Sequence, residues 1–163
     1  MKNSFIFLVF FLFLIPSFSQ VPGISVIQFD ALEKIMSSKS DSVYVLNFWA
    51  TWCKPCVEEL PAFEQATKDY KGKNVKVVLI CMDFKSKLKD RVIPFVKKNG
   101  LVSEVFLLNE PDYNSWIDKV DKNWSGSIPA TLIVKGDAGI KKFFEQSFEL
   151  TQLKSEIDKV INQ

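Results

Sequence analysis

The stretch Asn47-Phe48-Trp49-Ala50-Thr51-Trp52-Cys53-Lys54-Pro55-Cys56 decides the fold, because it joins a buried strand to a helix that opens with two cysteines. Residues 43–49 (VYVLNFW) are rich in β-branched and aromatic side chains, which is typical of a buried strand. Residues 54–70 predict a helix that ends before Gly72 and that Pro61 is expected to kink. The two cysteines therefore lie where a strand gives way to a helix.

Strands and helices alternate on both sides of this stretch. Further strands are predicted at 75–82, 105–108, 131–134 and 140–144, and further helices at 30–37, 87–99, 111–120 and 150–161. The last two strands form a hairpin around Gly136–Gly139. This order indicates one α/β domain with a mainly parallel central sheet, an antiparallel edge hairpin and helices on both faces.

The N-terminus has the pattern of a secretory leader. Lys2 is followed by an apolar run over residues 5–15, then by Pro16 and the small residues Ser17 and Ser19. The run is shorter than the roughly 20 residues that a spanning helix needs. We therefore expect a signal peptide over 1–19, a mature domain over 20–163 and a periplasmic or otherwise extracytoplasmic location, with an uncleaved membrane anchor as the alternative.

The amino-acid composition excludes several kinds of catalytic and binding site. The formal net charge of +2 gives no indication of a nucleic-acid partner, and the chain has no histidine. Catalysis by Cys–His or Ser–His pairs is therefore excluded, and the commonest metal ligand is absent. No cofactor and no resident metal are expected.

Cys53 and Cys56 have the spacing of a redox pair on the first turn of a helix. The unpaired N–H groups and the dipole of a helix N-terminus favour a thiolate, so we expect the pKa of Cys53 to fall below about 8.5. The Cys53 thiolate would attack a disulfide, and Cys56 would resolve the mixed disulfide. Half of a zinc site is one alternative, although only Cys81 and carboxylates could complete it. A structural disulfide is another, although so small a ring gains little stability.

The quoted stretch resembles the active-site segment of thioredoxins, and its continuation VEELP (57–61) resembles the TlpA/ResA branch of envelope thiol–disulfide oxidoreductases. SIPAT (127–131) resembles the cis-proline segment of the same superfamily. The likeness runs from about Val26 to the C-terminus and implies a thioredoxin-like fold. The predicted helix and strand between residues 87 and 108 match the insertion of that branch.

The resemblance also implies roles for individual residues. A cis bond at Ile128–Pro129 would expose the backbone of Ile128 beside Cys53, where a substrate strand can pair, so Trp52, Ile128 and Pro129 are expected to bind substrate. Thioredoxins carry a buried Asp where this chain has Asn47, and the TlpA/ResA branch instead carries an acid that Glu59 matches. Glu59 lies three positions after Cys56, on the same helix face, and is the expected base. A solvated surface charge is the alternative.

Other residues have plainer interpretations. Cys81 is expected to be a small core residue, with a third redox thiol as the alternative. The basic side chains between Lys85 and Lys98 are expected to be solvated, with a docking patch for an acidic partner as the alternative. Trp116 and Trp124 are expected to pack in the core rather than line a substrate groove.

The function that these residues predict is disulfide exchange on protein thiol substrates outside the cytoplasm, in the reducing direction. Pro55, before the second cysteine, resembles reductants more than strong oxidants. The implied partners are protein thiols or disulfides and an upstream membrane electron donor, and a monomer is expected. Two other classes stay open, a thiol peroxidase and a non-catalytic metal- or copper-binding module of the same fold.

Overall fold

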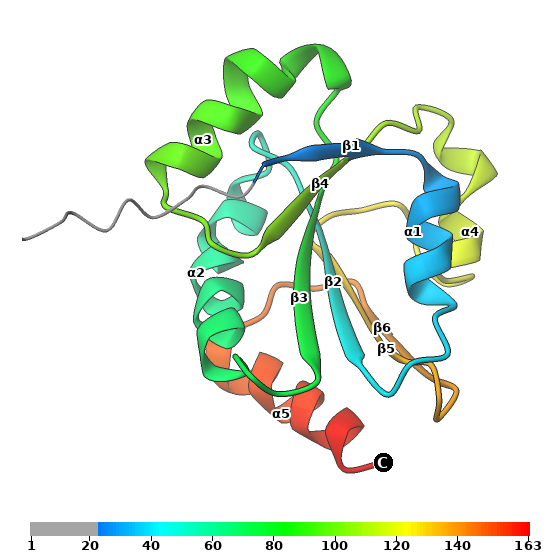
Figure 1. The fold of residues 1–163 in the computed structure, drawn as a ribbon. Coiled ribbons are helices and arrows are strands. Elements are labelled where there is room, and N and C mark those ends of the chain that lie inside the picture. Colours follow the sequence, from blue (N-terminus) through cyan, green and yellow to red (C-terminus); the bar gives the residue numbers. More distant parts are fainter. Residues whose placement is uncertain (1–22) are drawn as a thin grey trace, which may run out of the picture.

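The computed structural model of the chain describes residues 23–163 and contains one six-stranded sheet (Figure 1). The strands are β1 (Ser25–Ile27), β2 (Val43–Trp49), β3 (Val75–Cys81), β4 (Glu104–Leu108), β5 (Ala130–Lys135) and β6 (Ile140–Phe144). The helices are α1 (Phe29–Met36), α2 (Lys54–Asp69), α3 (Ile93–Lys98), α4 (Ile117–Val120) and α5 (Leu150–Ile161), with the short turns η1 (Lys85–Lys87), η2 (Leu88–Val92) and η3 (Tyr113–Ser115). The predicted leader, residues 1–19, lies outside the described residues.

The strand order is β1-β4-β3-β2-β5-β6. The first four strands in that order run parallel, whereas β5 is antiparallel to β2 and β6 is antiparallel to β5. Helices α1 and α4 lie on one side of the sheet and α2 and α5 on the other (Figure 1). The predicted thioredoxin-like α/β fold is therefore confirmed, including the antiparallel edge hairpin and an insertion between β3 and β4.

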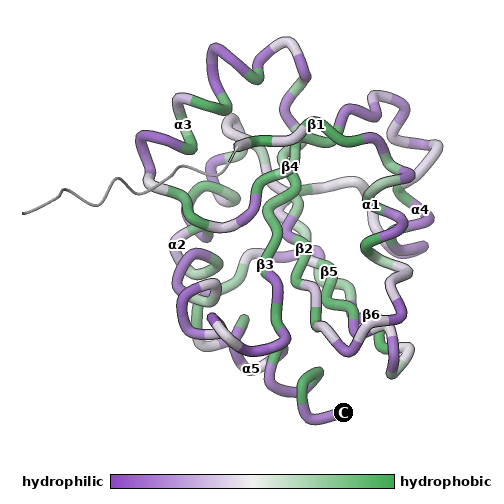
Figure 2. The backbone as a smooth tube through the Cα atoms, viewed as in Figure 1, coloured by the Kyte–Doolittle hydropathy of each residue, from purple (hydrophilic) through white to green (hydrophobic). Residues whose placement is uncertain are grey.

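The centre of the sheet is buried on both faces. Every residue of β2 except Tyr44 is buried, as expected for a strand covered by helices on both sides. Apolar segments gather on the strands and polar ones on the outer helices (Figure 2). Trp116 and Trp124 are 1% and 4% exposed, and both pack against the Phe48 ring, so their predicted core role is confirmed.

The helix predicted over 111–120 is wrong in extent. The chain there forms only η3 and α4, separated at Trp116, whose backbone lies at φ −140°. The Trp116 indole stacks on Phe29 with ring centroids 5.6 Å apart, and its Nε1 donates to the Glu110 carbonyl at 3.2 Å. Burial of this large ring outweighs the local helical preference of the segment.

The insertion also differs from the single helix predicted over 87–99. The chain passes through η1 and η2 before α3 begins at Ile93, so Pro94 stands in the first turn of α3, where its missing N–H costs nothing. Strand β1 was not predicted, because three residues give too short a pattern. Pro61 lies inside α2, which continues to Asp69. None of the helices within residues 23–163 combines the length and the apolar composition that crossing a membrane requires.

Candidate active site

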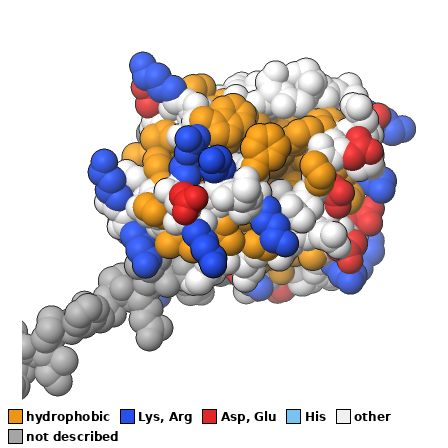
Figure 3. All heavy atoms as spheres, turned by 90° about the horizontal axis from the view of Figure 1, so that it is seen from above, with side chains coloured by type: hydrophobic (Ala, Val, Ile, Leu, Met, Phe, Trp, Pro, Cys, Tyr) orange, Lys and Arg blue, Asp and Glu red, His pale blue; other side chains and the backbone are white. Residues whose placement is uncertain are grey.

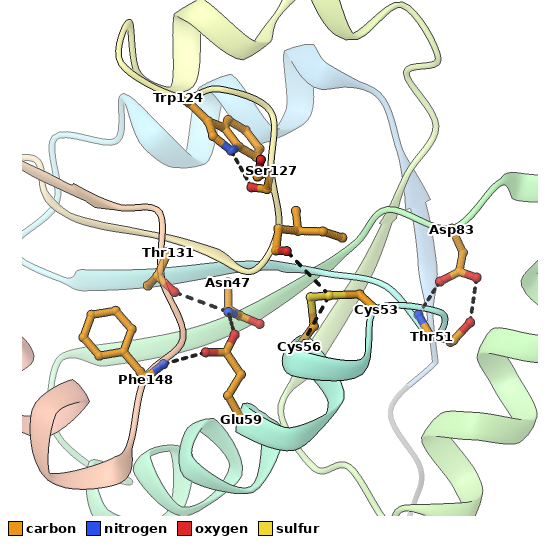
Figure 4. Close-up of a disulfide and its surroundings, with 11 residues drawn as sticks. Asn47, Thr51, Cys53, Cys56, Glu59, Asp83, Trp124, Ser127, Thr131 and Phe148 are labelled. Atoms are coloured by element: carbon orange, nitrogen blue, oxygen red, sulfur yellow. Dashed lines mark hydrogen bonds between the residues drawn. A yellow bond between two sulfur atoms is a disulfide. The ribbon is translucent and has the colours of Figure 1, made fainter.

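The two motif cysteines form a disulfide at the N-terminus of α2 (Figure 4). Cys53 is the N-cap of the helix, and its Sγ accepts a hydrogen bond from the backbone N–H of Cys56 at 3.3 Å. Cys53 is 5% exposed, whereas Cys56 is fully buried. Because the helix N-terminus carries a partial positive charge, it stabilises negative charge on Cys53 when the pair is reduced. Cys53 is thus the sulfur that a partner molecule can reach.

The predicted cis bond at Ile128–Pro129 is present, directly before β5. The Ile128 carbonyl oxygen lies 3.7 Å from the Sγ of Cys53, so this loop faces the reactive sulfur. Trp124 holds the loop from the inside, since its Nε1 donates to the Ser127 carbonyl at 2.8 Å. The Ile128 backbone is therefore fixed beside the disulfide, as the sequence predicted.

Glu145, directly after β6, forms hydrogen bonds to the loop that precedes Ile128. Glu145 accepts hydrogen bonds from the backbone N–H groups of Ser125 and Ser127, at 3.1 and 3.3 Å, and from the Ser125 hydroxyl. The Ser125 hydroxyl, then its backbone N–H, holds the pKa of the Glu145 carboxyl below its ordinary value. No local sequence pattern indicates this role, because Glu145 is 18 positions or more from both serines.

Glu59 is a buried acid beneath the disulfide (Figure 4). It is 4% exposed, and its two oxygens accept bonds of 2.8 Å from the Nδ2 of Asn47 and from the backbone N–H of Phe148. Burial raises the pKa of the Glu59 carboxyl from its ordinary 4.5 to about 7, against the smaller lowering effects of the Phe148 and Asn47 bonds. Glu59 is thus a buried carboxyl group with a raised pKa, and a solvated surface charge is the wrong description.

Asn47 lies in β2 and connects Glu59 to the rest of the site. Its Nδ2 bonds Glu59 at 2.8 Å and the Thr131 hydroxyl at 3.3 Å. Its Oδ1 is buried and has no hydrogen-bond partner among the described residues. In the view of Figure 4, Asn47 lies between the Glu59 carboxyl group and the disulfide. The buried side of the redox pair is therefore polar, with one acid and one amide.

A second buried carboxylate supports the loop that precedes Cys53. Asp83 is 2% exposed, and it accepts bonds of 2.7 Å from both the backbone N–H and the hydroxyl of Thr51. The Cys81 thiol donates to the same carboxylate at 3.4 Å. Asp83 lies two residues after the end of β3, so it connects the end of that strand to the turn that leads into Cys53. Sequence reasoning missed this residue, although an acid at the carboxyl end of a central strand was a usable signal.

Cys81 is fully buried, so its predicted place in the core is confirmed. Burial raises the pKa of its thiol well above the ordinary value, which keeps the sulfur protonated at neutral pH. Within residues 23–163, no three His, Cys, Asp or Glu side chains stand close enough together to hold a metal ion.

The structure brings the predicted site residues to one edge of the sheet. Cys53, Cys56 and Glu59 belong to the first turns of α2, and Ile128 and Pro129 face Cys53 from the loop before β5. Trp52 stands beside Cys53 and is 60% exposed, an unusual position for so large an apolar ring. The missed residues, Asp83 and Glu145, touch the backbone that carries this group rather than the sulfurs themselves.

Comparisons with known proteins agree with this geometry. A model of the AhpC/TSA family matches residues 19–143. The thiol-disulfide oxidoreductase ResA of Oceanobacillus iheyensis is 28% identical over 119 residues, which are 73% of this chain and 57% of that protein. This chain thus spans little more than half the length of that relative. The match supports the resemblance to the TlpA/ResA branch.

Solved structures show the same fold. A thioredoxin-related protein from Neisseria meningitidis serogroup B superposes with a TM-score of 0.66 at 22% identity, over 77% of this chain and 90% of that one. A secreted Mycobacterium tuberculosis disulfide oxidoreductase, described as homologous to DsbE, superposes with a TM-score of 0.56 at 23% identity, over 75% of this chain and 84% of that one.

Proposed function

The chain belongs to the AhpC/TSA family, and from that premise we propose that it is a thiol–disulfide oxidoreductase that reduces disulfides of protein substrates through Cys53 and Cys56. The observation that carries this proposal is the disulfide at the N-terminus of α2, with Cys53 facing the Ile128 carbonyl and Glu59 buried on the same helix, three positions after Cys56.

Reduction of a substrate begins with the reduced pair. The Cys53 thiolate attacks one sulfur of the substrate disulfide, the substrate S–S bond breaks, and its other sulfur leaves as a thiolate that takes a proton. The Cys56 thiol then loses its proton and attacks the Sγ of Cys53. The mixed disulfide breaks, the second substrate thiol is released, and two electrons have passed from the enzyme to the substrate. The Cys53–Cys56 disulfide is the product of this cycle.

Glu59 is the proposed base for the second step. Cys56 is buried and lies inside the helix, so its thiol needs a nearby group that can take its proton. A carboxyl group whose pKa burial raises to about 7 is a stronger base than an ordinary carboxylate and is still largely ionised slightly above neutral pH. Asn47 and Phe148 hold it in place.

Substrate binding is proposed for the surface around Cys53. The Ile128 carbonyl offers a main-chain acceptor to an extended substrate segment, next to Pro129, which has no N–H to compete. The exposed Trp52 ring supplies apolar contact on the other side of Cys53. This arrangement recognises backbone and apolar side chains, which suits an unfolded or extended polypeptide.

The setting of the reaction is part of the proposal. A leader over residues 1–19 would deliver a monomeric domain of residues 20–163 to the periplasm or another extracytoplasmic compartment. Each cycle leaves the pair oxidised, so the enzyme needs a dithiol donor, for which we propose a membrane protein. The secreted oxidoreductase among the structural neighbours is consistent with such a location.

Insulin reduction with a dithiol donor tests the function, beside a measurement of the reduction potential of the pair. We expect turnover that Cys53→Ser abolishes, and a potential nearer to roughly −270 mV than to roughly −120 mV. A potential above about −180 mV would contradict the reducing direction. Consumption of hydrogen peroxide faster than insulin would identify a thiol peroxidase, and bound copper without turnover would identify a carrier.

A further inference from the structure

The insertion between β3 and β4 is strongly basic and solvent-exposed. Between residues 85 and 98 it carries six basic side chains against one acidic side chain, Asp90. The six are Lys85, Lys87, Lys89, Arg91, Lys97 and Lys98, called the basic segment below. All six are exposed, and none forms a salt bridge with a carboxylate of residues 23–163. No salt bridge within residues 23–163 therefore neutralises this concentration of charge.

The basic segment begins at the edge of the sheet that carries the disulfide. Strands β2, β3 and β4 are parallel, so the residues that follow them lie at the same edge. Cys53 follows β2, and Phe84 and Lys85 follow β3. Asp83, the residue before Phe84, is bonded to Thr51 at 2.7 Å, which joins the start of the segment to the loop that leads into Cys53.

Exposed aromatic rings lie on this edge next to the lysines. Trp52, Phe84 and Tyr113 follow β2, β3 and β4, and they are 60%, 67% and 39% exposed. Figure 3 views this end of the molecule and shows apolar side chains across it, with Lys and Arg side chains beside them and Asp and Glu side chains mainly at the right of the view. A partner that reaches Cys53 therefore passes over apolar rings and close to the basic segment.

Acidic groups of the same edge do not cancel this charge. Glu58 is paired with Lys54 at 3.6 Å, on the helix that carries the cysteines. Glu110 follows β4 and lines one cavity with Lys85 and Tyr113, so it offsets part of the charge at the start of the basic segment. The six basic side chains still outnumber Asp90, Glu110 and Asp112, so the segment and its surroundings keep a net positive charge.

We propose that the basic segment selects protein substrates whose disulfide is flanked by acidic residues. The inference rests on the proposed disulfide exchange and adds a substrate class to it. Exposed charges contribute little to affinity one by one, but a cluster of one sign raises the association rate of an oppositely charged partner by roughly 10-fold or more at low salt. Because the segment adjoins the entrance to Cys53, the faster association applies to encounters that bring the substrate disulfide to Cys53.

A protein partner fits this surface better than an anionic membrane. Basic and aromatic side chains also occur on membrane-binding surfaces. Here, however, the redox pair opens onto the same edge, so a bilayer lying on the rings would cover Cys53. The surface therefore suits a ligand that brings its own disulfide to Cys53.

Two synthetic peptides test the proposal on the full-length reduced protein. Both contain the same disulfide loop, flanked by three Glu residues in one and three Lys residues in the other. Stopped-flow fluorescence measures the second-order rate constant for each at low salt and at 0.5 M salt. We expect the acidic peptide to react about tenfold faster at low salt, and the two rates to converge when salt screens the charges.

Charge-reversal variants show whether the basic segment causes the preference for the acidic peptide. Lys85→Glu/Lys87→Glu should remove or invert the preference for the acidic peptide. Lys71→Glu/Lys73→Glu, the matched control before β3 at the opposite edge, should retain it. The ratio of the two peptide rates is the readout, because a general change in Cys53 reactivity affects both peptides equally.

The outcomes separate this inference from the function on which it rests. Equal, measurable rates for both peptides would overturn the inference and leave the disulfide exchange intact. No reaction with either peptide would overturn the proposed function. Equal rates together with binding to phosphatidylglycerol vesicles that Lys85→Glu/Lys87→Glu abolishes would also overturn the inference, because the segment would then be a membrane-binding surface.

Discussion

The buried acid makes the stability of the oxidised protein depend on pH in a way that Glu59→Gln should remove. The chain has no histidine, the residue whose ordinary pKa lies between pH 5 and 8. The pKa values of the Asp69 and Glu145 carboxyls are lowered, so those groups are already ionised in this range. A change in stability between pH 5 and 8 therefore reports mainly on Glu59.

The sign follows from the two pKa values of this carboxyl. Below pH 4.5 Glu59 is protonated in both the folded and the unfolded chain and has no effect. As the pH rises toward 7 the unfolded chain releases the proton while the folded chain retains it, so the free energy of unfolding falls. Above about pH 7 both forms are ionised and the loss is complete.

The size of the loss follows from the same values. The difference between an ordinary pKa of 4.5 and a folded pKa of about 7 corresponds to roughly 3 kcal/mol in total. About 2.5 kcal/mol of this falls between pH 5 and pH 8. Glu59 is only 4% exposed, so solvent screening does not reduce this figure strongly.

Urea denaturation of the oxidised protein at pH 5 and pH 8 measures the effect. The free energy of unfolding of the wild type should fall by about 2.5 kcal/mol from pH 5 to pH 8. That of Glu59→Gln should change little, so this variant should be the more stable protein at pH 8. Glu58→Gln, an exposed neighbour paired with Lys54, is the matched control and should behave as wild type. Equal stability of wild type at both pH values, or the same response in both variants, would refute the reasoning.

Two further predictions concern the proposed reaction, and a third concerns the stability of the fold. In the reduced protein, alkylation at neutral pH should label Cys53 far faster than Cys56 or Cys81, as peptide mass mapping can show; faster labelling of Cys56 would reverse the assigned roles. With Glu59→Gln, attack by Cys53 should stay near the wild-type rate while release of the reduced substrate slows about 10²-fold, so stopped-flow traces should show the mixed disulfide accumulating; wild-type rates for both steps would exclude Glu59 as the base. Asp83→Asn leaves at least one of the three donors to this carboxylate, two on Thr51 and one on Cys81, without an acceptor. It should lower the free energy of unfolding by roughly 1–3 kcal/mol in urea titrations, and an unchanged midpoint would show that the Thr51 contacts do not stabilise the fold.

The sequence alone predicted the elements whose pattern is local, meaning that it lies within one short stretch of the chain. β2 covers the predicted residues 43–49, α5 covers the predicted 150–161, and the cis bond is where the proline motif indicated. These elements have long runs of one periodicity or a motif of several fixed residues. Their identity therefore does not depend on distant parts of the chain.

Contacts between distant residues could not be predicted in this way. Trp116 breaks the helix expected over 111–120 because its ring packs on Phe29, 87 positions earlier. The Phe148 N–H reaches Glu59 across 89 positions, and Asp83 reaches Thr51 across 32. No local pattern contains such pairs, so the sequence could indicate the acid at position 59 but not the groups that hold it.

The pairing of Asn47 with Glu59 explains how the site can hold one acid behind a buried cysteine. Two carboxyl groups in contact at this depth could not both ionise, and they would titrate as a coupled pair that shares a proton. Asn47 avoids this because its amide donates to Glu59 at 2.8 Å and carries no charge. On this side of the redox pair the described residues then place one buried carboxyl group, Glu59, whose pKa burial raises to about 7. The acid therefore sits on the helix of the two cysteines, and the neutral partner sits on the strand.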